Sequence, residues 1–190
     1  LLWEGKVTSR LLVTLMAGST AIGLLAGPAL AQRSLDGLAP VTDEMLANPD
    51  PADWLSYGRA TDNFRYSPLD QINTENVGQL QLVWSRGMES GNIQISPIAY
   101  DGVLFTNAPK DVFQAIDAAT GDFIWEYRRR LPATSNLRSA GDRNRGIVVY
   151  DDKLYFMSWD NFLVALDAKT GQMVWEVDRG QCNERVGNTS

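Results

Sequence analysis

An eleven-residue segment that recurs fifty positions later constrains the fold more than any other feature of this sequence. Residues 115–125 read AIDAATGDFIW and residues 165–175 read ALDAKTGQMVW, so six of the eleven positions are identical. The match continues upstream without a gap, where the tripeptide at 100–102 aligns with the one at 150–152. A fixed period of this size indicates stacked supersecondary units, each too small to bury its own apolar face.

Each repeat predicts four short strands. In the first repeat we expect strands at residues 95–100, 103–107, 112–117 and 123–127. Asp101-Gly102 between two apolar runs predicts a tight hairpin, and Gly121 supplies the positive φ that the second turn needs. Four antiparallel strands per repeat form a propeller blade. We therefore predict an all-β protein, a β-propeller of which the first two to three blades are present.

The recurring residues have mechanical roles in this interpretation. Asp117 can accept hydrogen bonds from the backbone of the following turn, and Thr120 can do so more weakly. Trp125 presents a large flat surface with one N–H donor, which suits a wedge between blades. We expect a strand at Leu80–Arg86 as well, in which Trp84 has the same role. The motif thus predicts the scaffold and does not predict a ligand.

The N-terminal residues have the pattern of a secretory signal peptide. Lys6 and Arg10 precede an apolar run at 11–25, and Ala29-Leu30-Ala31 supplies a cleavage pattern. We predict a signal peptide at 1–31, an irregular lead-in at 32–53 with a short helix at Asp43–Ala47, and a propeller segment at 54–190. Threonines, serine and glycines within the apolar run make a permanent transmembrane helix the weaker alternative. The mature protein is expected in the periplasm.

Composition excludes several kinds of chemistry for these residues. The chain has no histidine and a single cysteine, Cys182, so it offers no Ser-His-Asp triad, no histidine-bearing zinc site and no intrachain disulfide. The formal net charge is −6, whereas a nucleic-acid-binding protein needs a basic surface. We therefore expect no nucleic-acid partner.

The residues from Trp54 onward resemble the pyrroloquinoline quinone (PQQ)-dependent alcohol dehydrogenases, which include methanol, ethanol and sorbose dehydrogenases. The resemblance rests on WLSYGRATDNFRYSPLDQINTENVGQLQLVW at 54–84 together with the two spaced repeats, and it extends to Ser190. It implies an eight-bladed propeller, PQQ with a calcium or lanthanide ion, and hydride transfer from an alcohol to the quinone. It also implies cytochrome c or membrane ubiquinone as electron acceptor, with association at the inner membrane. Because the chain opens on Leu1 and stops after the second repeat, we expect it to be an N-terminal piece of such a protein.

The resemblance assigns two cofactor residues between the repeats. Family members grip a PQQ carboxylate with an arginine in an Asn-Arg-Gly sequence, which here is Asn144-Arg145-Gly146. A guanidinium fork suits a carboxylate, although Arg145 could instead be a surface arginine in a basic loop. Many members have a glutamate where this chain has Gln94, whose amide could donate to the quinone or could be a polar residue at a strand start.

Other family positions are absent or fall near the end of the chain. Ser139-Ala140 stands where methanol and ethanol dehydrogenases have two adjacent cysteines, which weakens assignment to those enzymes and leaves the sorbose-type branch open. Thr189 and, second to it, Ser190 match a hydroxyl that reaches the cofactor. The family's metal ligands and catalytic aspartate are expected beyond Ser190, so we assign no catalytic or metal residue.

Two other classes of protein stay open from the sequence. One is a non-enzymatic propeller scaffold of envelope protein assembly, which the 54–84 segment and the lack of a lipobox cysteine disfavour. The other is a secreted lectin or sensor, for which the sequence contains no positive signal.

Overall fold

The structure is a computed structural model that describes residues 33–91, 93–131 and 146–180. The described residues all belong to one compact unit, Gln32–Ser190. The predicted signal peptide at 1–31 lies outside them. Within the described residues, no helix has the length and apolar character needed to cross a membrane.

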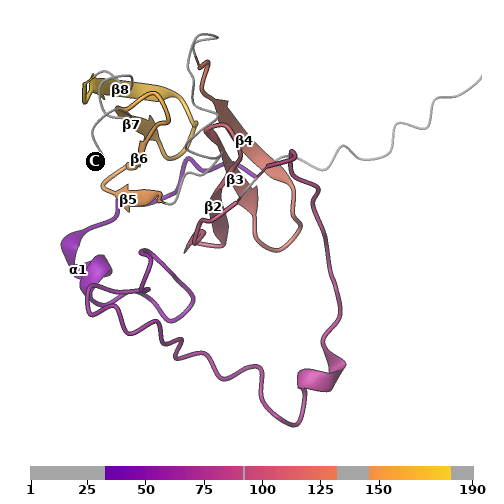
Figure 1. The fold of residues 1–190 in the computed structure, drawn as a ribbon. Coiled ribbons are helices and arrows are strands. Elements are labelled where there is room, and N and C mark those ends of the chain that lie inside the picture. The colour runs from indigo at the N-terminus through magenta and orange to yellow at the C-terminus, as the bar shows by residue number, and fades with distance from the viewer. Residues whose placement is uncertain (1–32, 92, 132–145, 181–190) are drawn as a thin grey trace, which may run out of the picture. The chain divides into compact units, whose positions relative to one another are not determined.

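Two four-stranded antiparallel sheets follow each other along the chain (Figure 1). The first, blade 1, contains β1 (Ile98–Tyr100), β2 (Val103–Ala108), β3 (Val112–Asp117) and β4 (Phe123–Arg128). The second, blade 2, contains β5 (Val148–Tyr150), β6 (Lys153–Met157), β7 (Phe162–Asp167) and β8 (Met173–Asp178). In each blade the strands lie in chain order, so the blade prediction is confirmed. Strand β1 begins later than predicted because Pro97 has no N–H for a ladder.

Two of the three hairpin turns of blade 1, between β1 and β2 and between β3 and β4, form as the sequence predicts. Asp101 and Gly102 both have positive φ, 48° and 69°, which is the conformation of a type I′ turn. Asp117 Oδ1 accepts hydrogen bonds from the backbone N–H groups of Ala119 and Thr120 at 2.9 and 3.0 Å. The equivalent bonds recur in blade 2, and both blades have a bulge at the same repeat position.

The core lies between the two blades. Phe113 of β3 and Phe156 of β6 stack with ring centroids 3.7 Å apart, and both side chains are buried. Trp125 of β4 crosses to blade 2, where its Nε1–H donates to Ala168 O at 3.0 Å. Each blade alone would leave this apolar face in water, so the packing of neighbouring blades explains the period of the repeat.

The predicted strand at Leu80–Arg86 is wrong, although the predicted role of Trp84 is confirmed. No described segment forms a ladder with these residues, and Leu82 and Val83 are more than four-fifths exposed. A strand requires a hydrogen-bonded partner, and apolar sequence alone cannot supply one. Trp84 Nε1–H nevertheless donates to Ala118 O at 3.0 Å. Trp125 makes the equivalent bond to Ala168 O, and the two acceptors are fifty residues apart.

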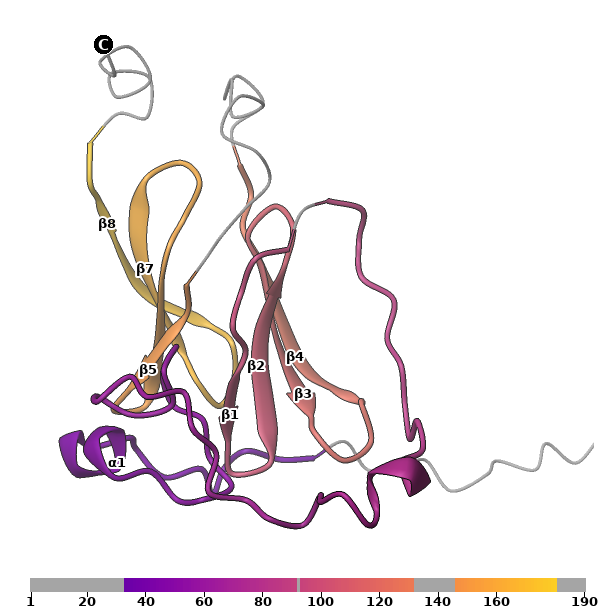
Figure 2. The ribbon, with the colours of Figure 1, turned by 60° about the horizontal axis from the view of Figure 1, so that its bottom comes forward.

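The lead-in crosses the hairpin-turn ends of both blades (Figure 2). It contains the predicted helix α1 (Asp43–Ala47), and a 3-10 turn η1 (Val77–Gln79) follows later. Val41 pairs with Asp151 next to β5, and Trp54 pairs with Ala99 of β1. These bridges cover part of the free edges of β1 and β5, which would otherwise expose unpaired backbone groups.

Candidate functional site

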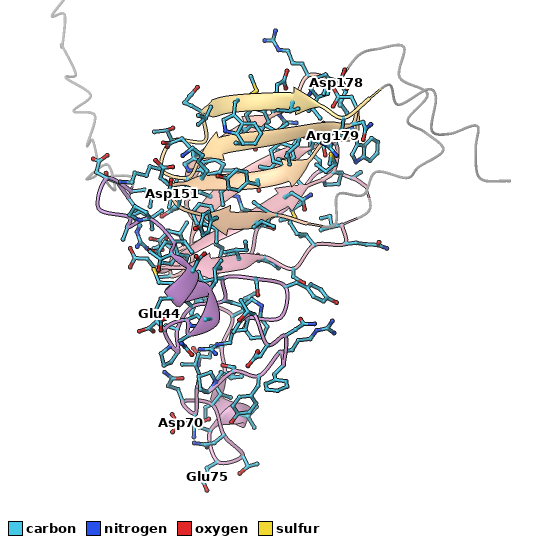
Figure 3. All side chains as sticks on the ribbon, turned by 90° about the vertical axis from the view of Figure 1, so that its left-hand side faces the viewer. Glu44, Asp70, Glu75, Asp151, Asp178 and Arg179 are labelled. Carbon is cyan, nitrogen blue, oxygen red and sulfur yellow. The ribbon has the colours of Figure 1, made fainter. Side chains whose placement is uncertain are left out.

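Each blade has two ends with different kinds of connection. Tight hairpin turns lie at one end, near Asp151, whereas β8 ends at Asp178, followed by Arg179, at the other end (Figure 3). That second end, which we call the loop end, also holds the residues at 109–111, 129–131, 146–147 and 158–161. Longer connections on a rigid sheet are where binding residues gather, so the loop end is the candidate site.

Of the predicted cofactor residues, the structure describes only Gln94. Gln94 lies on an exposed segment four residues before β1. Arg145 lies outside the described residues, which resume at Gly146, and Gly146 leads through the buried Ile147 into β5. Gln94 and Gly146 therefore precede equivalent strands of the two blades, β1 and β5. Thr189, Ser190 and the Ser139-Ala140 pair also lie outside the described residues.

A buried ion-pair cluster at the loop end was not found by sequence reasoning. Arg129, just past β4, donates from Nε and Nη2 to both carboxylate oxygens of Asp160 at 2.6 and 2.8 Å. Its Nη1 donates to Glu176 Oε2 of β8 at 2.7 Å, and the Arg129 side chain is only 8% exposed. The guanidinium also lies 4.7 Å from the centre of the Phe162 ring.

The electrostatics of this cluster favour the charged forms of both partners. Burial disfavours charged Asp160, but hydrogen bonds from Arg129 and Ser158 outweigh it and leave the pKa of Asp160 below its usual value. Burial likewise opposes charge on Arg129, yet its bonds to Asp160 and Glu176 raise the pKa of Arg129 well above its usual value. The cluster is therefore a fixed ion pair at neutral pH and supplies no proton donor or acceptor.

A second buried carboxylate completes the contact between the blades. Asp111, in the β2–β3 turn, is fully buried, and its Oδ2 accepts the backbone N–H of Trp159 at 2.6 Å. The backbone of Arg129 donates to Asp111 O at 3.2 Å. The same backbone bond recurs fifty positions later in blade 2, where Arg179 N donates to Asn161 O, so this bond is a feature of the repeat.

The described part of the loop end offers no metal site. It contains no group of three or more acidic, cysteine or histidine side chains able to hold an ion. The donors assigned from the sequence are an arginine, an amide and hydroxyls, all of which suit carboxylate groups. A Cβ added to Gly146 would meet no atom within 4 Å. Of these assigned donors only Gln94 is described, and the described residues contain no assigned catalytic base.

Comparisons with known proteins identify the family of the chain. The model of a family described as the PQQ β-propeller domain of glucose, ethanol and alcohol dehydrogenases matches residues 54–176. The dehydrogenase subunit of the quinone alcohol dehydrogenase of Gluconacetobacter polyoxogenes is 38% identical over 136 residues, which is 70% of this chain and 18% of that protein. The quinohemoprotein alcohol dehydrogenase ADH-IIG of Pseudomonas putida is 38% identical over 143 residues, 70% of this chain and 19% of the relative.

Solved structures show the same fold. The quinohemoprotein alcohol dehydrogenase of Comamonas testosteroni superimposes with a TM-score of 0.66 at 35% identity, over 73% of this chain and 21% of that one. A europium-containing methanol dehydrogenase gives a TM-score of 0.64 at 26% identity, over 74% of this chain and 25% of that one. The chain therefore spans about a fifth to a quarter of the length of these relatives.

Proposed function

Because the chain belongs to the family of PQQ β-propeller domains of glucose, ethanol and alcohol dehydrogenases, we propose that the full-length protein is a periplasmic quinoprotein alcohol dehydrogenase. The family match over residues 54–176 is the observation that carries this proposal. Primary alcohols, sugar alcohols and sorbose-like compounds are the proposed substrates. The residues at 1–31 are proposed to direct export and to be removed after Ala31.

The chain's own contribution to the reaction is to bind and orient the cofactor. Arg145 would bind a PQQ carboxylate through its guanidinium fork, and the amide of Gln94, which aligns with Asn144 in the second repeat, would donate to the quinone. Thr189 and Ser190 would supply hydroxyl donors. The ion pair between Arg129 and Asp160 holds the two blades together at the same end, so that these donors stay in register.

The remaining parts of the machinery are proposed to lie beyond Ser190. When bound, PQQ with its calcium or lanthanide ion supplies the acceptor for hydride from the alcohol carbon. The metal ligands and the proton acceptor would come from later blades. Cytochrome c or membrane ubiquinone would take the electrons.

Reconstitution of the full-length protein tests the proposal. The apoprotein should gain dye-linked alcohol oxidation when PQQ is added together with calcium or a lanthanide, and neither component alone should suffice. Primary alcohols, sugar alcohols and sorbose should be tested in parallel. A fully loaded protein that oxidises none of them would refute the proposed activity.

Substitution of the cofactor arginine tests the assignment of the site. Arg145→Ala should weaken PQQ binding by a factor of ten or more, because a charge-assisted bidentate bond contributes about 1.5–3 kcal/mol. Arg143→Ala removes an arginine two positions away and should leave the affinity unchanged. Equal PQQ affinities of the two variants, measured by equilibrium dialysis, would remove Arg145 from the site.

A further inference from the structure

A cavity of about 490 Å³ lies beside the segment that leads into β1. It is open to solvent and is lined by two parts of the chain that are distant in sequence, the loop after the lead-in and the residues just before β1. Its walls combine aromatic, apolar, hydroxyl and cationic side chains, namely Trp54, Tyr57, Arg65, Ile95, Ser96 and Pro97. A volume of this size is typical of sites for small molecules.

The loop that lines the cavity is held by its own backbone bonds. Trp54 exchanges two hydrogen bonds with Ala99 of β1, at 2.8 and 3.1 Å, and the adjacent Leu55 is 1% exposed. At the far end of the loop, Arg65 N donates to Gly58 O at 3.1 Å. The aromatic and cationic walls therefore stand on a fixed frame before any ligand arrives, which lowers the entropic cost of binding.

Arg65 has no acidic partner among the described residues. Its guanidinium carbon lies 4.3 Å from the centre of the Tyr57 ring, so the cation is stacked on an aromatic face. By contrast, Arg33, Arg128 and Arg129 each form at least one ion pair with a carboxylate. Stacking leaves the in-plane N–H groups of a guanidinium available for a carboxylate.

From these features we propose that the cavity binds a planar aromatic carboxylate of the benzoate type. Arg65 would bind the carboxylate through two parallel N–H donors. Tyr57 and Trp54 would provide flat surfaces for the ring, while Ile95 and Pro97 exclude water from its edge. The lining residues do not include the assigned cofactor residues, although Ile95 directly follows Gln94, and occupation of the cavity does not depend on the proposed dehydrogenase activity.

Calorimetric titration of the full-length protein with benzoate tests this site, in the apoprotein and in the PQQ-loaded protein. Benzoate should bind to both with the same affinity, whereas benzyl alcohol, which has the same ring and no charge, should bind at least tenfold more weakly. Arg65→Gln should reduce benzoate affinity about tenfold or more, and Tyr57→Leu should reduce it while Tyr57→Phe retains it.

Arg86→Gln is the matched control, because Arg86 also stacks on an aromatic ring, that of Phe123, but lines no part of the cavity. It should leave benzoate affinity unchanged. The site is refuted if Arg65→Gln binds benzoate like the wild type, or if benzyl alcohol binds equally well. It is also refuted if PQQ and benzoate displace each other, since the cavity would then belong to the cofactor. Should Arg65→Gln fail to fold, the Tyr57 pair of variants decides by the same readout.

Discussion

At the scale of single residues, the contact between blades depends on a tryptophan packed onto a glycine. A Cβ built on Gly171 would come within 2.6 Å of Trp125 Cδ2, and one on Gly121 would come equally close to Trp84 Cδ2. Both glycines also have φ near +70°, a conformation that other residues adopt only with strain. Two constraints therefore require glycine at this position of the repeat. One is the positive φ of the turn, and the other is the tryptophan ring that packs against the glycine.

Gly171→Ala should therefore destabilise the propeller by about 2–4 kcal/mol, from left-handed backbone strain combined with displacement of the Trp125 ring. Gly146→Ala is the control, because an added Cβ meets open space there. The urea unfolding midpoint of the full-length protein measures both. A Gly171→Ala midpoint as high as that of Gly146→Ala would contradict the proposed packing.

The indole N–H of Trp125 makes a smaller, separable contribution. Trp125→Phe keeps an aromatic ring but loses the bond to Ala168 O, so we expect a loss of about 1 kcal/mol in addition to the loss of buried area. Trp159→Phe is matched to it, since within the described residues only the backbone of Trp159 is hydrogen-bonded across the blades. If the two variants unfold at the same urea concentration, the indole bond contributes nothing.

At the scale of elements, the sequence predicts the strands that recur in each repeat. It does not predict which residues distant in the chain pair with one another. The four strands of each blade follow from local alternation and turn residues, and α1 was placed at its observed bounds. The segment at 80–86 has the composition of a strand, but composition does not supply a partner ladder. For the site, spacing placed Gln94 before β1, whereas the pairing of Arg129 with Asp160 joins two turns of different blades. The repeat aligns Arg129 with Arg179, fifty positions later, but the sequence alone does not show which residue Arg129 pairs with.

Acid should weaken the ion pair between the blades. Because the pKa of folded Asp160 is lowered, its stabilisation is complete above the pKa of an unfolded aspartate, about 3.9, and is lost as the pH falls through the lower folded value. Asp160→Asn should cost about 3 kcal/mol at pH 7, because it leaves a buried cation incompletely paired. The difference from wild type should shrink below about pH 4.

Arg128→Gln is the control for this prediction, because Arg128 is half exposed and its ion pairs with Glu89 and Glu126 contribute at most about 1 kcal/mol. Urea unfolding at pH 7 and at pH 3 compares the variants. A deficit in Asp160→Asn that stays constant over this range would show that the carboxylate charge is not the source of stability.

At the scale of the whole molecule, the face of blade 2 turned away from blade 1 differs from the face between them. Cross-strand register places Val148, Tyr155, Met157, Leu163, Trp175 and Val177 together on that outer face. Several are strongly exposed, including Val148 at 55% and Val177 at 49%. The corresponding face of blade 1 is buried by blade 2, so an isolated pair of blades exposes an apolar sheet face to water.

The chain from Gln32 to Ser190, expressed alone, should therefore self-associate or aggregate, because an exposed apolar sheet face promotes contact between copies. Light scattering after size-exclusion chromatography measures this. Val177→Lys places a charge on the outer face of blade 2 and should increase the monomer fraction. Leu69→Lys adds the same charge at an exposed apolar residue outside both blades and should have a smaller effect. A monodisperse, cooperatively melting wild-type fragment would show that two blades suffice, because the outer face would then tolerate water without a covering blade.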